Sequence, residues 1–82
     1  MDKKEYTVAY TEFIGDQLYS DQKILGTVLA STLKEAGELA KVDYGIPVAE
    51  PYDHGTHLIF NQDDGTMEKF WAIVEKEDNE NE

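Results

Sequence analysis

The sequence predicts a small α+β fold, in which an antiparallel sheet of three to five strands carries one main helix on one face and ends in a C-terminal β-hairpin. Several observations lead to this prediction. Residues 6–14 alternate aromatic and β-branched side chains as a strand does, residues 32–42 begin with a helix-capping pair, and residues 57–74 form two apolar runs around a turn sequence. A chain of 82 residues has room for one domain, which we place at residues 1–74.

The first expected strand covers residues 6–14 and ends at Gly15. Residues 17–31 leave two possibilities open. Their apolar residues follow the spacing of threes and fours that is typical of a helix, but Gly26-Thr27-Val28 is unfavourable inside a helix. Because the second observation weighs against a long helix, we expect a short strand near residues 26–30.

The main helix is expected at residues 32–42. Thr32 and Glu35 have the spacing of a capping box, in which each side chain accepts a hydrogen bond from a backbone N–H group of the first turn. Small and apolar residues repeat along one face of this helix, and Gly45 ends it. Two prolines and a glycine within residues 46–55 then indicate a loop or an edge segment.

The C-terminal hairpin is expected to turn at Asp64-Gly65, because Asp-Gly favours a tight type I′ turn. This turn would place Phe60 opposite Lys69 and Leu58 opposite Trp71. Both faces of the hairpin are then apolar, and one helix can cover only one of them. The other face needs the 17–31 segment, a binding target or a second subunit. We expect a homodimer, with the interface residues Ile59, Phe70, Trp71 and Val74.

The composition determines the charge of the surface. Eighteen acidic residues stand against seven lysines and no arginine, which gives a net charge of −11. A field of this sign repels nucleic acid and anionic membranes, and it attracts basic proteins. It therefore argues against direct binding of nucleic acid or of a membrane. Residues 75–82 contain no apolar side chain, so we expect them to form a disordered acidic tail.

Features that would direct the chain out of the cytoplasm are not found in the sequence. The chain has no cysteine, its first residues lack the apolar run of a signal peptide, and no segment approaches the ~20 apolar residues of a membrane span. These observations favour a small cytoplasmic domain.

No pattern of residues indicates catalysis, so we expect a protein that is not an enzyme. His54 and His57 lie close to Asp53, but a zinc site needs a further ligand at a suitable spacing. Asp63-Asp64 lacks the spacing of a calcium-binding EF-hand loop. The glycines are scattered and form no phosphate-binding loop. We therefore predict no catalytic, metal or cofactor site.

The acidic surface is the strongest candidate for a function. Duplex DNA carries one negative charge per ~1.7 Å of its axis, and a protein that occupies a DNA-binding cleft must present carboxylates on one surface. We expect this chain to mimic DNA and to inhibit a basic DNA-binding protein by occupying its nucleic-acid-binding surface. The candidate partner-binding residues are acidic and are spread along the domain: Glu12, Asp16, Asp21, Glu35, Glu38, Asp43, Asp63, Asp64 and Glu68.

Residues 31–40, Ser-Thr-Leu-Lys-Glu-Ala-Gly-Glu-Leu-Ala, are similar to a strand-then-capped-helix segment of a small bacteriophage inhibitor of host RNA polymerase. In its size, its acidity, its lack of cysteine and its β–α–β-hairpin order, the chain resembles the small acidic bacteriophage proteins that disable host machinery. This resemblance implies action in the host cytoplasm on a DNA-binding protein, with HU-type nucleoid proteins as candidate targets. The alternative is an inhibitor or regulator of host RNA polymerase that does not act by DNA mimicry.

Overall fold

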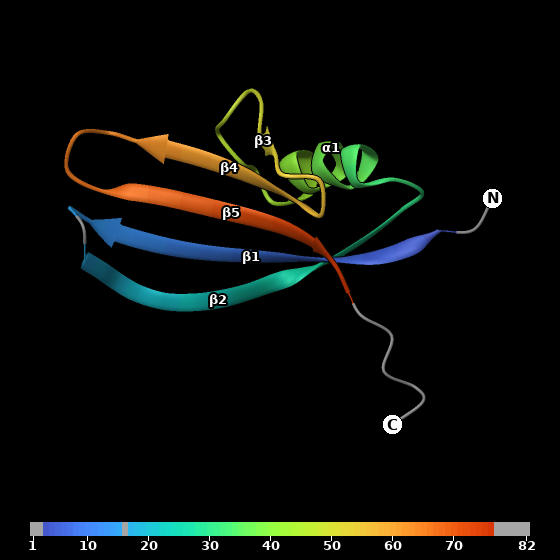
Figure 1. Cartoon of the computed structure of the whole chain (residues 1–82), viewed down its shortest axis with the longest axis horizontal. Helices are drawn as coiled ribbons and strands as arrows, with labels where there is room; N and C mark the ends of the chain where they lie inside the picture. The colour runs from blue at the N-terminus through green and yellow to red at the C-terminus, as the bar shows by residue number, and fades with distance from the viewer. Residues whose placement is uncertain (1–2, 16, 77–82) are drawn as a thin grey trace.

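A five-stranded antiparallel sheet and one helix make up the computed structural model, which describes residues 3–15 and 17–76 (Figure 1). The strands lie side by side in the order β2-β1-β5-β4-β3. The α+β class with one helix and an antiparallel sheet is therefore confirmed. The elements are β1 (Lys4–Ile14), β2 (Gln17–Ala30), α1 (Leu33–Asp43), β3 (Tyr52–Asp53), β4 (His57–Asp63) and β5 (Glu68–Glu75).

The last strand of the sheet runs a little past residue 74. β5 continues to Glu75, and the N–H group of Lys76 donates a hydrogen bond of 2.9 Å to the carbonyl oxygen of Glu5. The sheet thus extends past residue 74. The rest of the expected acidic tail, like Asp16, lies outside the described residues. No helix in the described part of the chain is long and apolar enough to cross a membrane.

The segment whose structure the sequence left open is the long edge strand β2. The expected short strand at 26–30 is only the last part of this 14-residue strand. Register shifts interrupt its pairing with β1, and at one of them Val8 pairs with Gly26 while Ala9 pairs with Ile24, so that Leu25 is an extra residue. Each such bulge lengthens the spacing between side chains on one face. The bulges therefore explain why the apolar residues follow a helix-like spacing in a strand.

The register divides the side chains of the sheet between two faces. We call them the helix face, which α1 contacts, and the open face. The buried residues on the helix face are Tyr6, Val8, Val28, Ala30, Leu58, Phe60, Trp71 and Ile73. The open face carries Thr7, Ala9, Thr11, Phe13, Leu18, Ile24, Thr27, Leu29, Ile59, Phe70, Ala72 and Val74, together with the polar residues His57 and Asn61 and, at one end, the carboxylates Asp63 and Glu68.

Both ends of α1 are fixed by local hydrogen bonds. The N–H group of Glu35 donates to Oγ1 of Thr32 at 3.1 Å, and the Glu35 carboxylate accepts a 2.8 Å bond from the N–H group of Ser31. The reciprocal bond thus reaches one residue further back than a capping box predicts. At the other end Gly45 adopts a φ of 64°, and the N–H group of Ile46 bonds back to a carbonyl of the last turn. This left-handed glycine ends the helix as expected.

Glycine allows the helix to approach the sheet closely. A Cβ atom at Gly37 would come within 2.5 Å of Cδ1 of Leu58, and one at Gly26 would overlap the hydroxyl group of Tyr44. That hydroxyl group donates a 3.2 Å hydrogen bond to the carbonyl oxygen of Thr27. The hydrophobic core therefore lies between α1 and the helix face, and α1 leaves the open face bare.

The turn between β4 and β5 differs from the expected type I′ turn. Phe60 pairs with Trp71 and Leu58 with Ile73, two residues away from the expected register. Asp64 does not have positive φ, because among the described residues only glycines do. A four-residue loop follows the last pair instead, and aspartate side chains bond to its N–H groups. A shift of two residues leaves every paired side chain on its expected face, since the period of a strand is two.

Candidate functional site

Ion pairs occupy one end of the sheet. Lys4 Nζ lies 3.6 Å from a carboxylate oxygen of Glu75, and Lys76 Nζ lies 3.4 Å from one of Glu5. We call this end, where β1 begins and β5 ends, the paired end. Twelve of the eighteen acidic residues fall within the described residues. Of these twelve, Glu5 and Glu75 form the ion pairs at the paired end. The other ten described carboxylates make no ion pair within the described chain.

A first group of carboxylates lies at the opposite end of the sheet, where β1 meets β2 and β4 meets β5 (Figure 1). We call Asp63, Asp64 and Glu68 the turn group. The register places Glu68 opposite both Asp63 and Phe13, so these side chains lie next to one another at the edge of the open face. Asp21 is exposed on β2, further from the turns.

Asp64 fixes the conformation of its own turn. Its Oδ1 atom accepts hydrogen bonds of 3.0 Å from the N–H groups of Met67 and Thr66 and from the Thr66 hydroxyl group. The bond from the Met67 N–H group, followed by those from Thr66, lowers the pKa of Asp64 from 3.8 to about 2. The carboxylate form is thus the one that the turn requires.

We predict that the carboxyl group of Asp64 titrates near pH 2 in the folded chain. Because the folded pKa is depressed, the stabilisation is complete above the unfolded pKa of about 4 and is lost as the pH falls from there through about 2. Carboxyl chemical shifts measured by NMR against pH test this. Thr66→Val removes one of the donors and should raise the midpoint. A midpoint at or above 3.8 in the parent chain would contradict the assignment.

Glu12 lies near the turn group, but its carboxylate is already engaged. The Tyr10 hydroxyl donates to Oε2 of Glu12 at 2.5 Å, and the Ser20 hydroxyl donates to Oε1 at 3.4 Å. Burial, and then the hydrogen bond to Glu12 and its charge, raise the pKa of Tyr10 to about 12. Lys69 lies opposite Glu12 in the register of β1 and β5. The carboxylate of Glu12 is therefore engaged by hydrogen bonds within the chain and is less available to a partner.

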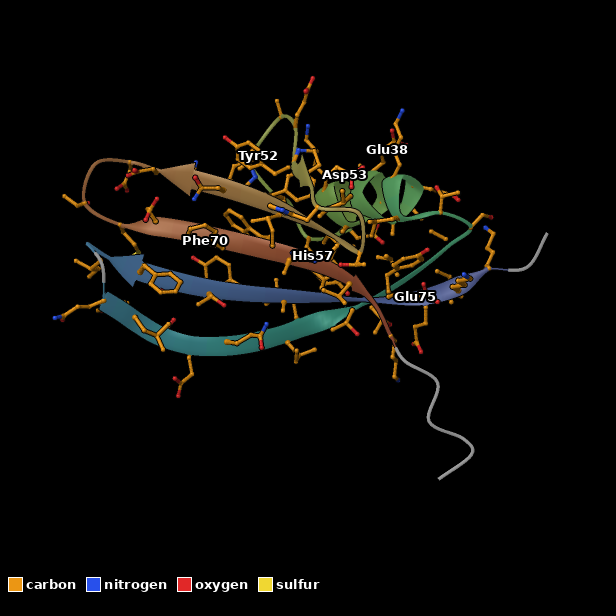
Figure 2. All side chains as sticks on the ribbon, in the orientation of Figure 1. Glu38, Tyr52, Asp53, His57, Phe70 and Glu75 are labelled. Carbon is orange, nitrogen blue, oxygen red and sulfur yellow. The ribbon has the colours of Figure 1, made fainter. Side chains whose placement is uncertain are left out.

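A second group of carboxylates borders a groove beside α1. The groove, of about 820 Å³, lies between α1 and residues 46–53, and Glu38, Glu50 and Asp53 contribute to its lining. We call these three the groove group. Figure 2 shows Glu38 and Asp53 on the same side of the molecule, around α1 and β3. The sequence-based set omits Glu50 and Asp53, because only the return of the chain along α1 brings them to Glu38.

Of the other two acidic residues of α1, Glu35 is less suited to binding than Asp43. Glu35 is committed to the helix cap, and Asp43 is exposed at the end of the helix. Lys34 and Lys41 also line the groove, and Lys41 Nζ donates a 2.9 Å hydrogen bond to the carbonyl oxygen of Ala49. The eight predicted partner-binding residues that the structure describes thus fall into separate groups, and lysines line the groove beside one of them.

The charge of one copy is smaller than that of DNA of the same length. The molecule is 42 Å long, and a duplex of that length carries about 25 phosphates. The net charge of the chain is −11. One copy can therefore match a duplex over short patches, such as the turn group and the groove group, but not along its whole length.

The histidines lie close together in the loop before β4. The rings of His54 and His57 stack with centroids 4.9 Å apart, and Tyr52 lies beside His54 at 6.5 Å. The carboxylate of Asp53 accepts a 2.8 Å hydrogen bond from the N–H group of Gly55, which stabilises the turn. Within residues 3–15 and 17–76, no cluster of three or more histidine, cysteine or acidic side chains could hold a metal ion.

The four predicted interface residues do not share one face. Trp71 lies on the helix face, is only 8% exposed, and has its ring centroid 5.0 Å from that of Tyr10. It is a core residue, and the pairing of the two strands explains why, since neighbouring residues on a strand point to opposite faces. Ile59, Phe70 and Val74 do lie together on the open face.

β2 enlarges the apolar surface of the open face. Leu18, Ile24 and Leu29 are 52%, 61% and 59% exposed, and the register places them opposite residues of β1 that belong to this face. Sequence reasoning did not assign them to this face, because the structure of residues 17–31 was ambiguous. Phe13 and Phe70 continue the surface, with their rings in edge-to-face contact at 5.5 Å.

Comparisons of the chain with protein-family models, with curated proteins and with solved structures gave no match.

Proposed function

We propose that this chain is an acidic binding protein, not an enzyme, that mimics DNA and occupies the basic nucleic-acid-binding surface of a DNA-binding protein, thereby inhibiting it. The observation that carries the proposal is the surplus of carboxylates: ten of the twelve that are described have no ion partner within the described chain. Apart from Glu12 and Glu35, whose carboxylates are engaged by hydrogen bonds within the chain, these groups are available to the lysines and arginines of a partner. HU-type nucleoid proteins are the candidate targets, in the cytoplasm of a host cell.

The turn group and the groove group are the surfaces that would contact the partner. In this proposal one helix packs on one face of the sheet, and the C-terminal hairpin carries the turn group beyond it. Two separated acidic patches can replace two stretches of phosphates in a basic cleft without reproducing a whole duplex. Charges arranged in this way accelerate association and give specificity, more than they add affinity.

Salt should weaken the complex strongly. Between about 50 and about 200 mM salt we expect affinity for an HU-type protein to fall at least about tenfold, because exposed charges are screened beyond about 8 Å at physiological ionic strength. Fluorescence anisotropy with a labelled HU-type protein measures this. Duplex DNA of unrelated sequence should displace the chain. An affinity that does not change with salt, or a complex that holds DNA and the chain together, would refute mimicry.

The second candidate is a phage-type inhibitor or regulator of host RNA polymerase that does not act by DNA mimicry. The open face favours it, because a surface whose centre is apolar and uncharged suits a contact that DNA does not compete for. Competition separates the two candidates. A polymerase inhibitor of this kind should bind the polymerase in the presence of excess duplex DNA and should leave DNA bound to HU-type proteins.

A further inference from the structure

The open face has the anatomy of a protein interface. Its central positions, around Ala9, Thr11 and Ala72, carry no charged side chain among the described residues. Charged groups lie at its two ends, with the Glu5–Lys76 ion pair at the paired end and the turn group at the other. Interfaces between proteins share this pattern of an apolar centre and a polar rim.

We propose that a second copy of this chain covers the open face, so that two sheets pack face to face around a two-fold axis. The helices then lie on the outside of the dimer. Face-to-face packing of two sheets at a separation of about 10 Å is a common solution for sheets with one bare face. A two-fold axis lets the same patch serve both copies.

The area of the open face is sufficient for a dimer. Four strands spaced about 4.8 Å apart, over about nine residues each, give a face of about 19 by 30 Å, or about 570 Å². Two copies together would bury about 1,100 Å² if each face is treated as flat, without the extra area of the protruding side chains. Crystal contacts mostly bury less than about 800 Å², and an interface that forms in solution should bury more than about 1,000 Å². The face is thus of the size that a modest dimer needs.

The distribution of charge favours a second copy over a basic partner on this face. A lysine-rich surface would find nothing to pair with at its uncharged centre, and burying unpaired charges there would be costly. Two copies meet without bringing carboxylates into the centre. The groove group faces away from the contact, beside α1. The dimer also doubles the charge available to a basic partner from −11 to about −22.

The open face is a better contact than the edge of β2. Three register shifts bend this edge strand and disturb the row of N–H and C=O groups that an added strand would need. Bulges of this kind are a common protection of edge strands against pairing with another chain. In this dimer the exposed side chains of Leu18, Ile24 and Leu29 contact the second copy through the open face and not through the edge of β2.

Sedimentation velocity over a range of concentrations tests the dimer. The parent chain should approach twice its mass of 9.3 kDa at high concentration. Phe70→Asp and Val74→Asp each place a carboxylate on the open face of both copies, and we expect dimer affinity to fall at least about tenfold. Val42→Asp adds the same charge at a helix position that is 79% exposed, and it should leave the dimer unchanged.

Several outcomes would overturn the proposal. A parent chain that stays monomeric at about 1 mM has no dimer of this kind. A dimer that survives both substitutions on the open face must use another surface, such as the β2 edge. If Phe70→Asp does not fold, as judged by circular dichroism, the half-exposed position Val74 decides the question. No other protein takes part in this measurement, so its failure would leave the proposed function to be tested separately.

Discussion

Replacing Phe60 with alanine should remove a large part of the free energy of unfolding. Phe60 is 1% exposed, pairs with Trp71, and lies in the core between the helix face and α1. Loss of a buried phenyl ring costs about 3–5 kcal/mol in free energy of unfolding. A domain of 82 residues has about 4–12 kcal/mol in all. The substitution therefore removes much of the total stability, and in the lower part of that range it removes all of it.

Thermal and urea unfolding followed by circular dichroism measure this effect. With a shift of about 4–8 °C per kcal/mol in a domain of this size, we expect the melting temperature to fall by at least about 12 °C. Val42→Ala is the control, because Val42 is 79% exposed on α1 and its truncation should change stability by no more than about 0.5 kcal/mol. A melting temperature of Phe60→Ala within about 3 °C of the parent would show that this core does not hold the fold together.

Elements with local signals were predictable from the sequence. The helix was expected at 32–42 and lies at Leu33–Asp43, because its cap residues and its terminal glycine are all neighbours in the sequence. The faces of β4 and β5 were also predictable, since alternation does not depend on the exact turn. The predicted turn type was wrong. The side chains of Asp63 and Asp64 accept hydrogen bonds from the loop N–H groups, so a loop of four residues forms in place of a tight turn.

Elements that depend on tertiary pairing were not predictable. β2 reads like a helix, because bulges opposite β1 change the period of its apolar residues, and a bulge is defined by the partner strand. The burial of Trp71 was not predictable for a similar reason, because the sequence of β5 does not show which face of the strand α1 covers. The alternation of side chains along the hairpin predicts an apolar second face, but the contribution of Ile24 and its neighbours on β2 needed the register.

The candidate site also has one property that the sequence predicts and another that depends on the fold. The negative charge is a property of composition and needs no fold. The sorting of carboxylates into groups does need the fold, because hydrogen bonds commit Glu12 and Glu35 within the chain, while ion pairs commit Glu5 and Glu75. The remaining groups are those that a basic partner can use. This distinction makes the arrangement of the charges, and not only their number, open to experiment.

Neutralising four of the available carboxylates should weaken binding to an HU-type protein about 100-fold. The variant combines Asp63→Asn and Glu68→Gln in the turn group with Glu38→Gln and Asp53→Asn in the groove group. At about 0.7 kcal/mol for each exposed ion pair, the loss is about 2.8 kcal/mol, which corresponds to about two powers of ten. Asp64 is left in place because its carboxylate accepts three hydrogen bonds in the turn, whereas Asp63 and Asp53 each accept one, which the side-chain oxygen of asparagine can also accept. Each half of the variant alone should lose about tenfold.

The control removes charges that are already paired. Glu5→Gln with Glu75→Gln changes the net charge by the same amount as either half of the variant, but at carboxylates that Lys76 and Lys4 occupy. If partner binding depends on the arrangement of the free carboxylates, this pair should cost clearly less than either half, in titrations at low salt where Coulomb interactions are strongest. Equal losses in all three double variants would mean that the partner responds only to net charge, and the turn and groove groups would have no special part in binding.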